Sequence, residues 1–434
     1  MPRIRLSAKT FVLLMLSVST LVGADLAGAA DWPQWRGPTR DGQSVGQEWP
    51  DSLQEDRLQL LWRTELGPSY SGPIVSGTGV FTTETQDEAT EVVTAYDRQT
   101  GERLWRTEWP GAMTVPFFAA ANGSWIRATP ACDGETLYVL GIRDVLVALD
   151  VATGDERWRI DFPATMGVEP PKFGAASSPM VADGHVYVQA GNALQKIDGQ
   201  SGEIVWTAAK GQGRRSDGAF SSPYFSDVDG EPLVVVQTRE ALKGIDPESG
   251  AERWSQPIQA FRGMNILTPV VYRDRLFTSA HSGRSQLWRV SATPSDAPAS
   301  DAENADPGNL NQPLGLAELW SNKSQAYMSS PVVVDGHLYL HLKNQRVQCL
   351  NLETGEETWR SQPRGKYQSM VVGGDRILTL DSGGELILFH ASPDAYTELD
   401  RRRVSDDETW AHLAVCGGQV FVRELNALAA YAWK

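Results

Sequence analysis

Short runs in which apolar and polar residues alternate make up most of this chain, and turns containing Gly and Asp separate them. The surroundings of Asp183-Gly184 and Asp335-Gly336 are typical, because a Pro and a short apolar stretch precede each pair and an alternating strand follows it. Alternation with a period of two predicts half-buried β-strands, and Asp-Gly between two such runs predicts a tight hairpin. The sequence therefore predicts an all-β protein rich in hairpins.

A second phrase recurs after each hairpin: an apolar strand that ends in Asp or Asn, a Gly four residues later and a Trp four residues after the Gly. The Asp caps the turn, the Gly supplies a positive φ, and the Trp is a large apolar anchor on the returning strand. Counting each outer strand by its Trp gives Trp105, Trp158, Trp206, Trp254, Trp320 and Trp359, with a degenerate copy that ends near Leu399. A hairpin followed by this phrase gives four antiparallel strands, which form one blade of a β-propeller.

The count reaches seven complete blades, and an eighth begins at Trp410 but lacks an outer strand before Lys434. Residues 61–66 match residues 104–109 closely, although no inner strands precede them. We expect residues 58–66 to supply the missing strand, because closing the ring removes an open sheet edge. The prediction is an eight-bladed β-propeller that spans residues 58–434 and is closed by an N-terminal strand.

The repeated phrase, Ala-x-Asp-x-x-x-Gly-x-x-x-Trp, resembles the tryptophan-docking motif of the pyrroloquinoline quinone (PQQ) repeat superfamily, in which eight blades form a ring. The resemblance covers the chain from about Leu58 onward. The superfamily contains quinoprotein alcohol and glucose dehydrogenases, which hold PQQ and calcium in the central funnel, and binding platforms such as the lipoprotein BamB. The opening Asp31-Trp32-Pro33-Gln34-Trp35-Arg36-Gly37-Pro38 is similar to the start of a group of secreted bacterial PQQ-repeat proteins.

Residues 1–30 have the features of a secretory signal: Arg3, Arg5 and Lys9, an apolar run at residues 11–16, and small residues near Ala30. The run is too short to span a bilayer as a stable anchor. We therefore expect a periplasmic or extracellular monomer, with residues 31–57 as an extension before the propeller. No Cys follows the expected cleavage position, so the lipid attachment of BamB is not expected here.

The formal net charge is −15 and becomes −17 without residues 1–30, which hold three basic residues and one acidic residue. An acidic surface of this size argues against binding of nucleic acid or of anionic membranes. An insertion at residues 291–315 contains four acidic residues and no basic one, and interrupts blade five where its docking phrase is expected. We expect a disordered acidic loop there, since a calcium loop would need a different Asp spacing.

Motifs for metal, haem or nucleophilic chemistry are scarce in this sequence. Cys132, Cys349 and Cys416 lie far apart and form neither a Cys-x-x-Cys-His motif nor the vicinal pair of many PQQ alcohol dehydrogenases, so free buried thiols are expected. His337 and His341 are four residues apart on a predicted strand, where that spacing does not indicate a metal site.

Any binding site is expected on the face formed by the loops that join one blade's outer strand to the next blade's inner strand. These loops hold more basic than acidic residues, and they carry aromatic residues that can converge on the central channel. Solvated charges and rings that merely fill the channel are the alternative. The predicted ligand-binding residues on this funnel face are Trp125, Arg127, Arg214, Arg215, Arg262, Asn265, Tyr327, Tyr367 and Trp410.

Two classes of function follow from these observations. The favoured one is a binding or scaffold propeller that takes a protein or an anionic ligand, with no catalytic residues assigned. The alternative is a PQQ- and calcium-dependent quinoprotein dehydrogenase acting on alcohols or sugars. The resemblance implies that such an enzyme needs a Glu and an Asn near calcium and an Asp as base, for which Glu169, Asn265 and Asp217 are the loop candidates.

Overall fold

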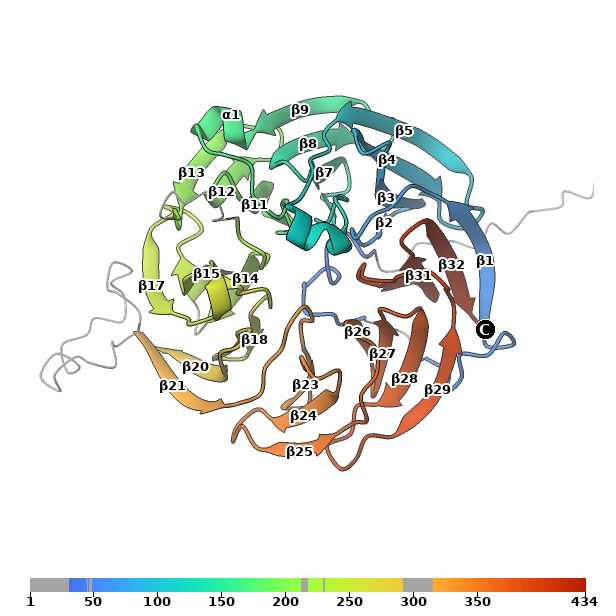
Figure 1. Cartoon of the computed structure of the whole chain (residues 1–434), viewed down its shortest axis with the longest axis vertical. Coiled ribbons are helices and arrows are strands. Elements are labelled where there is room, and N and C mark those ends of the chain that lie inside the picture. The colour runs from blue at the N-terminus through green and yellow to red at the C-terminus, as the bar shows by residue number, and fades with distance from the viewer. Residues whose placement is uncertain (1–30, 45, 47–48, 212–217, 229–230, 292–314) are drawn as a thin grey trace, which may run out of the picture.

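The structure is a computed structural model that describes residues 31–434 except 45, 47–48, 212–217, 229–230 and 292–314. Eight four-stranded antiparallel sheets surround a central axis, as Figure 1 shows. In seven of these sheets the strand order follows the chain. The predicted eight-bladed β-propeller is therefore confirmed. The insertion expected at residues 291–315 lies almost entirely outside the described residues.

The first four blades are each formed by one continuous stretch of chain. Their strands are β2 (Ile74–Ser76), β3 (Gly79–Gln86), β4 (Thr90–Asp97) and β5 (Arg103–Pro110); β6 (Ala131–Cys132), β7 (Thr136–Leu140), β8 (Val145–Asp150) and β9 (Glu156–Asp161); β10 (Met180–Ala182), β11 (His185–Ala190), β12 (Ala193–Asp198) and β13 (Ile204–Ala208); and β14 (Tyr224–Val228), β15 (Glu231–Gln237), β16 (Ala241–Ile245) and β17 (Glu252–Pro257).

Blades five to seven follow the same plan, and blade eight combines the two ends of the propeller. Their strands are β18 (Val270–Tyr272), β19 (Arg275–Ser279), β20 (Ser285–Ser291) and β21 (Gly315–Asn322); β22 (Val332–Val334), β23 (His337–His341), β24 (Val347–Asn351) and β25 (Glu357–Arg360); β26 (Gln368–Gly373), β27 (Arg376–Asp381), β28 (Glu385–His390) and β29 (Glu398–Arg403); and β30 (Ala414–Cys416), β31 (Gln419–Arg423), β32 (Ala427–Trp433) and β1 (Leu58–Glu65).

β1 closes the ring as the outermost strand of blade eight. It pairs antiparallel with β32, from Leu58 opposite Trp433 to Glu65 opposite Ala427. β32 would otherwise present unpaired backbone groups at an open edge. The predicted closure by residues 58–66 is thus present in the structure.

A bulge precedes the docking position in every outer strand. In β9, for example, the register with β8 shifts between Ala148 and Leu149, and Trp158 is the residue opposite Ala148. The indole Nε1 of Trp158 donates to the carbonyl oxygen of Gly199 in the next blade, at 3.0 Å. A Cβ at Gly202 would lie 2.7 Å from this ring, so the indole packs directly on the glycine. These contacts join adjacent blades.

Blade seven departs from this pattern. The degenerate copy expected near Leu399 has Asp400 opposite Leu388, which is the position that Trp holds elsewhere. The Asp400 carboxylate accepts hydrogen bonds from the Leu53 backbone N–H at 2.7 Å and from the Ser52 hydroxyl at 2.9 Å. Blade seven is thus joined to the segment that leads into β1 rather than to an inter-strand turn.

The segment from Asp31 to Ser44, part of the extension expected at residues 31–57, fills the central channel from one side. Trp32 forms a β-bridge with Val75 of blade one, and Gln43 forms one with Val372 of blade seven. The backbone N–H of Cys132 in blade two donates to the Pro33 carbonyl at 2.8 Å. We call residues 31–44 the plug, because these contacts connect blades on several sides of the channel.

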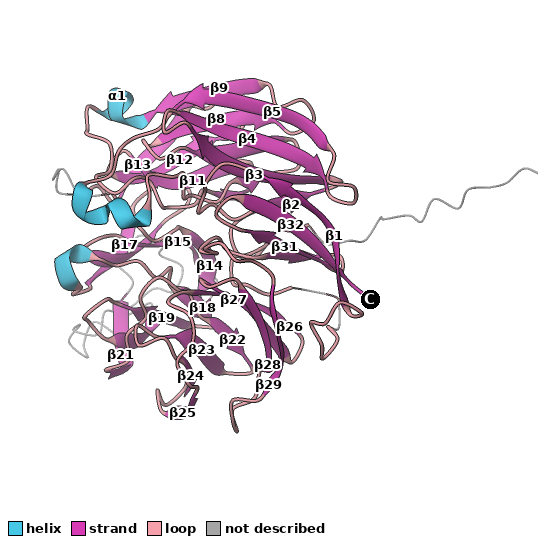
Figure 2. Ribbon diagram, turned by 45° about the vertical axis from the view of Figure 1, so that its right-hand side comes forward, coloured by secondary structure: helices cyan, strands magenta, loops and turns pink. Residues whose placement is uncertain are grey.

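The three short helices in the described part of the chain all lie in loops between blades. They are η1 (Phe117–Asn122), α1 (Phe162–Met166) and η2 (Phe261–Gly263). Figure 2 shows the helices on one face of the propeller and the C-terminus at the opposite face. The helix-bearing face carries the connections between blades and is therefore the funnel face.

Candidate functional site: a central cup closed by the plug

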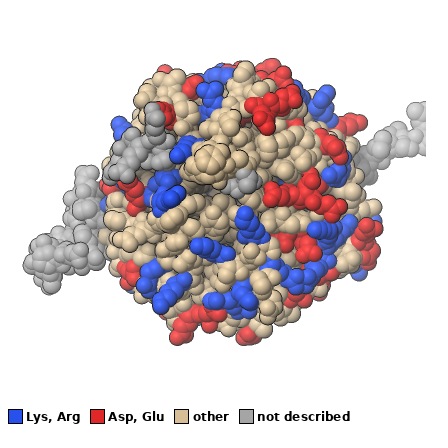
Figure 3. Space-filling view, in the orientation of Figure 1, with Lys and Arg blue, Asp and Glu red and all other residues tan. Residues whose placement is uncertain are grey.

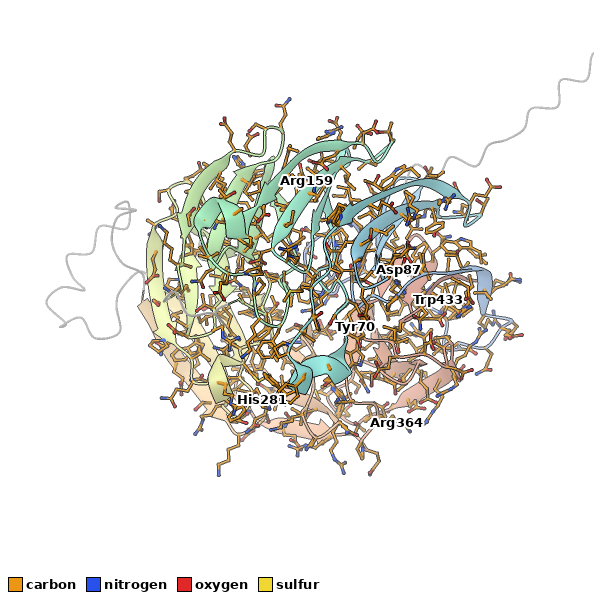
Figure 4. The ribbon with its side chains drawn as sticks, turned by 45° about the horizontal axis from the view of Figure 1, so that its top comes forward. Tyr70, Asp87, Arg159, His281, Arg364 and Trp433 are labelled. Carbon is orange, nitrogen blue, oxygen red and sulfur yellow. The ribbon has the colours of Figure 1, made fainter. Side chains whose placement is uncertain are left out.

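A cavity of about 290 Å³ lies on the propeller axis, and we call it the central cup. All eight blades contribute to its wall, mostly through residues just before the innermost strands, and Trp35 of the plug contributes from below. Figure 4 shows Tyr70, one of the wall residues, near the axis, whereas Arg159 lies out at the rim. The plug therefore makes the channel a blind cavity that opens toward the funnel face.

Two buried arginines of the plug lie against the indole of Trp35. The guanidinium carbons of Arg36 and Arg40 are each 5.5 Å from the centroid of that ring. His412 meets the same indole edge-on, at 5.8 Å between centroids. The floor of the cup is therefore an aromatic ring with cationic groups packed on it, an arrangement that the ring's quadrupole favours.

Backbone carbonyls hold both guanidinium groups in place. Arg40 donates to the carbonyl oxygens of Pro179 at 2.8 Å and Ser178 at 3.1 Å, and Arg36 donates to those of Asp41 at 2.8 Å and Pro331. Burial lowers the pKa of Arg36 to about 10 and the pKa of Arg40 to about 9. Both groups remain protonated at neutral pH, so the region beneath the cup is positively charged.

Aromatic side chains cover two sides of the wall. On one side Tyr70 stacks on Trp410 with centroids 4.6 Å apart, and Tyr367 meets Trp410 edge-on at 4.5 Å. On the other side the centroids of Phe173 and Phe220 are 6.2 Å apart. Such walls bind apolar faces of a ligand and exclude water from polar contacts between them.

A ladder of hydroxyl groups forms another part of the wall. In blades two to six a Ser or Thr stands two residues before the innermost strand, and its hydroxyl oxygen accepts a backbone N–H from the preceding blade. The donor–acceptor pairs are Gly72 to Thr129 at 3.0 Å, Thr129 to Ser178 at 3.0 Å, Ser178 to Ser222 at 2.9 Å, Ser222 to Thr268 at 3.0 Å and Thr268 to Ser330 at 3.4 Å. Each hydroxyl keeps its own hydrogen as a donor.

Arg127 is the one Lys or Arg among the described wall residues, and none of them is Asp or Glu. Its Nη2 donates to the Gly123 carbonyl at 2.7 Å, and its guanidinium lies 5.9 Å from the centroid of Tyr70. Burial lowers the pKa of Arg127. Figure 3 shows a mostly uncharged middle of this face, with several Lys and Arg between the middle and the lower edge.

The structure brings together four of the predicted site residues and separates others. Arg127, Tyr327, Tyr367 and Trp410 line the cup, whereas Trp125 does not. The other four predicted residues are taken up next, and the assignment of a ligand to any of these residues stays a prediction.

Arg262 and Asn265 have local roles in the loop between blades four and five. The Arg262 guanidinium lies over the exposed Phe261 ring, 5.2 Å from its centroid. The Asn265 amide nitrogen donates to the carbonyl oxygens of Thr238 and Arg239 at 3.1 and 3.0 Å. Arg214 and Arg215 lie outside the described residues.

Sequence reasoning missed the floor of the cup. Trp35 lies in residues 31–38, which match none of the blade repeats. This mismatch was the one signal in the sequence that the segment has a role of its own. Tyr70 and Gln368 had no comparable signal, because only the closed ring brings them into the same cavity wall as Trp410.

The donor set of the cup does not fit a calcium–quinone pair. A calcium site requires several oxygen ligands with carboxylates among them, and the described wall residues include none. Of the candidates under the dehydrogenase alternative, Asn265 holds backbone carbonyls through its amide nitrogen, Glu169 is not in the wall, and Asp217 is outside the described residues. No cluster of three or more His, Cys, Asp or Glu suited to a metal occurs in the described part of the chain.

The three cysteines and His341 are buried in the blades. All three cysteines are buried and free, as the sequence predicted, and burial raises the pKa of Cys132 and of Cys416 to about 11. His341 is buried at the end of β23, and burial lowers its pKa to about 4. In the residues that the structure describes, no helix has the length and apolar character needed to cross a bilayer.

Comparison with known proteins agrees with this architecture. The family model described as outer membrane protein assembly factor BamB matches residues 89–361 and 315–429. The chain is 24% identical over 269 residues to the outer membrane protein assembly factor BamB of Yersinia pestis, a match that covers 59% of this chain and 62% of that protein. The match thus spans less than two thirds of that relative.

Two solved structures share the fold at low sequence identity. BamB from Moraxella catarrhalis has a TM-score of 0.58 at 14% identity, covering 87% of this chain and 98% of that chain. The quinohemoprotein alcohol dehydrogenase from Comamonas testosteroni has a TM-score of 0.64 at 13% identity, covering 93% of this chain and 80% of that chain. With the eight blades and the family match over most of its length, the chain belongs to the BamB-like family of PQQ-repeat β-propellers.

Proposed function

We propose that this protein is an exported, non-enzymatic binding propeller that holds an anionic group of its partner or ligand in the central cup. The observation that carries the proposal is the composition of the cup wall, in which aromatic rings, hydroxyl groups and Arg127 occur without a described Asp or Glu. Such a cavity offers apolar contact and hydrogen-bond donors to an anion and no general acid or base of the carboxylate type.

Electrostatics support an anionic rather than a cationic occupant. An aromatic cage can bind a quaternary ammonium ion, but Arg127 in the wall and Arg36 and Arg40 beneath Trp35 would repel it. The expected exported chain has a formal charge of −17 and repels an anion at long range, so the attraction comes from the cationic groups at the cup alone. We therefore expect capture to depend on the local positive potential at the cup and to weaken as salt is added.

The resemblance to BamB supports a partner that is a protein and a location in the periplasm. The expected secretory signal at residues 1–30 supports export, although the chain carries no Cys at the expected cleavage position for a lipid anchor. The dehydrogenase alternative has the shared fold in its favour, but the cup lacks the carboxylates for calcium in its described wall.

The test is equilibrium binding of two labelled peptides of equal length, one acidic and one basic, to the purified protein. We expect saturable binding of the acidic peptide, weakened by salt and by Arg127→Gln. Arg262→Gln is the matched control, because it removes one positive charge from the same face outside the cup. Reduction of a dye with an alcohol or a sugar after addition of PQQ and calcium would contradict the non-enzymatic assignment.

Export is tested separately. A reporter enzyme fused behind residues 1–30 should appear in the periplasm or the medium. Retention of the reporter in the cytoplasm would contradict this part of the proposal.

A further inference from the structure

Several polar atoms in one sector of the cup wall have no hydrogen-bond partner within the described part of the chain. They are the Gln368 Oε1, the Ser369 Oγ, the Trp410 Nε1 and the His412 Nε2, and Arg127 adds its Nε. Gln368 is only 4% exposed. Buried polar atoms without a partner are rare in folded proteins because they are costly, so a group of them on residues that line a cavity points to a ligand that supplies the missing hydrogen bonds.

The unpaired atoms include both hydrogen-bond donors and hydrogen-bond acceptors. The Trp410 Nε1 and the Arg127 Nε can only donate a hydrogen bond. The Gln368 Oε1 can only accept one, since the amide nitrogen of this side chain donates to the Arg364 carbonyl at 3.3 Å. The ligand must therefore offer hydrogen-bond acceptors and donors within the same small volume.

His412 is a second acceptor. Its Nδ1 lies 3.2 Å from the Leu413 carbonyl oxygen, which cannot donate, so the ring hydrogen is on Nδ1. Burial lowers the pKa of His412 to about 3, and the imidazole is neutral at physiological pH. The Nε2 then presents a lone pair, which a simple oxyanion such as sulfate or acetate cannot satisfy.

The shape and charge of the cup narrow the ligand further. The aromatic faces of Trp410 and Phe220 belong to different sides of the wall, and Trp35 closes the bottom, so the occupant is compact rather than an extended segment. The positive charge of Arg127 in the wall favours a ligand that carries a negatively charged group. The hydroxyl ladder adds donors for further oxygen atoms of the occupant.

We infer that the central cup binds an acidic sugar, with the carboxylate at Arg127 and the ring hydroxyls at Gln368, Ser369 and His412. The C–H faces of the sugar ring pack against the aromatic sides of the wall, whose negative faces attract these weakly positive hydrogens. This inference rests on the proposed function, because it specifies the chemistry of the anionic group that the cup holds.

The probes are D-glucuronate, D-glucose and an acidic peptide, titrated into the full purified protein by calorimetry and by tryptophan fluorescence. We expect one molecule of glucuronate to bind per chain, with glucose bound at least tenfold more weakly. Trp410 and Trp35 in the wall and floor should give a fluorescence change on binding.

Matched variants separate the two kinds of contact. Arg127→Gln should weaken glucuronate about 10–100-fold, the range for a lost charged hydrogen bond, and leave glucose unchanged. Gln368→Met, which is nearly isosteric, should weaken glucuronate and glucose alike. Arg262→Gln should change neither. Melting curves identify any variant that fails to fold, and the glucuronate-to-glucose ratio of the unmodified protein needs no variant.

The outcomes distinguish this inference from the proposed function. Binding of the acidic peptide without binding of glucuronate would overturn the acidic-sugar assignment and leave the binding propeller standing. Glucose bound as tightly as glucuronate would overturn the placement of a carboxylate at Arg127. Binding of none of the three probes would overturn the inference and remove the support for an anion site in the cup.

Discussion

Asp400 accepts a hydrogen bond of 2.7 Å from the backbone N–H of Leu53, at the outer-strand position that holds Trp in the other blades. The presence of Asp instead of Trp at this position is explained by the closure of the ring. Blade eight takes its outer strand from residues 58–65, so β32 and β1 are not joined by a turn on which a Trp could pack. The carboxylate instead fixes the chain just before β1.

Replacement of Asp400 tests this junction. We expect Asp400→Ala to lower the free energy of unfolding by about 1–3 kcal/mol, because the Leu53 N–H and the Ser52 hydroxyl lose their acceptor. Asp400→Asn keeps one acceptor oxygen and should cost less. Chemical denaturation of the three proteins gives the comparison, and equal stability of the alanine variant and the parent would contradict the role of the carboxylate.

The same carboxylate gives a pH dependence. Burial alone would raise the pKa of Asp400, but hydrogen bonds from Leu53 and Ser52 outweigh it and lower the pKa. Its contribution to stability is complete above the unfolded-state pKa of about 3.9 and is lost as the pH falls through the lower folded-state pKa. The melting temperature of Asp400→Ala should therefore approach that of the parent at acid pH.

Ring closure predicts unequal effects of two N-terminal deletions. Deletion of residues 31–66 removes β1 and exposes the edge of β32, so we expect a large loss of stability and association between chains. Deletion of residues 31–44 removes only the plug and should leave a closed, monomeric ring that melts at a lower temperature than the parent. Melting curves and light scattering measure both effects. A protein without residues 31–66 that melts like the parent would contradict the closure.

The docking tryptophans are expected to join the blades. Trp158→Ala should lower the free energy of unfolding by about 2–3 kcal/mol, below the range for a fully buried aromatic side chain, because the indole is only half-buried between the two blades. Trp158→Phe keeps much of the packing and loses the hydrogen bond to Gly199, so it should cost about 1 kcal/mol. Full stability of the alanine variant, together with loss of ligand binding, would assign the residue to a site instead.

Two glycines with nearly the same backbone conformation allow the cost of backbone strain to be measured separately from the cost of a steric clash with the docking indole. Gly202 has φ +75 and Gly184 has φ +73, but a Cβ at Gly202 would lie 2.7 Å from the Trp158 indole, whereas nothing lies within 4 Å of one at Gly184. Alanine at Gly184 should cost about 1–2 kcal/mol for the left-handed conformation alone. Alanine at Gly202 should cost clearly more, and equal losses would show that the indole does not press on this turn.

Ionisation of Asp144 should make stability fall as the pH rises, which is opposite in sign to the effect of Asp400. Burial raises its pKa to about 7, and the hydrogen bond from the Gly191 backbone N–H only partly offsets this. Because the folded-state pKa lies above the unfolded one, the contribution of Asp144 is complete below pH about 4 and is lost as the pH rises through 7. Asp144→Asn should flatten the fall in stability between pH 5 and 8. An unchanged slope would contradict the burial of an ionisable carboxyl here.

The sequence determined the blades because their signals are local. Asp-Gly hairpins, alternating strands and the Asp, Gly and Trp of the docking phrase act within about a dozen residues, and their repetition defines the ring. The match of residues 61–66 to 104–109 also identified the closing strand, since a strand keeps its pattern wherever it pairs. The exception near Leu399 has Asp400 in place of Trp, and this side chain contacts the N-terminal segment.

The central cup, by contrast, was decided by tertiary structure. Arg127, Tyr327, Tyr367 and Trp410 were predicted from the sequence because they are basic or aromatic residues in the loops that face the channel. Arg262 and Asn265 are of the same types, but a positive φ of 52° at Arg262 and two backbone carbonyls at Asn265 turn these side chains to local contacts. Trp35 reaches the cup only because the plug enters a channel that exists once all eight blades are in place. Side chains far apart in the chain meet there through ring geometry, which no local pattern encodes.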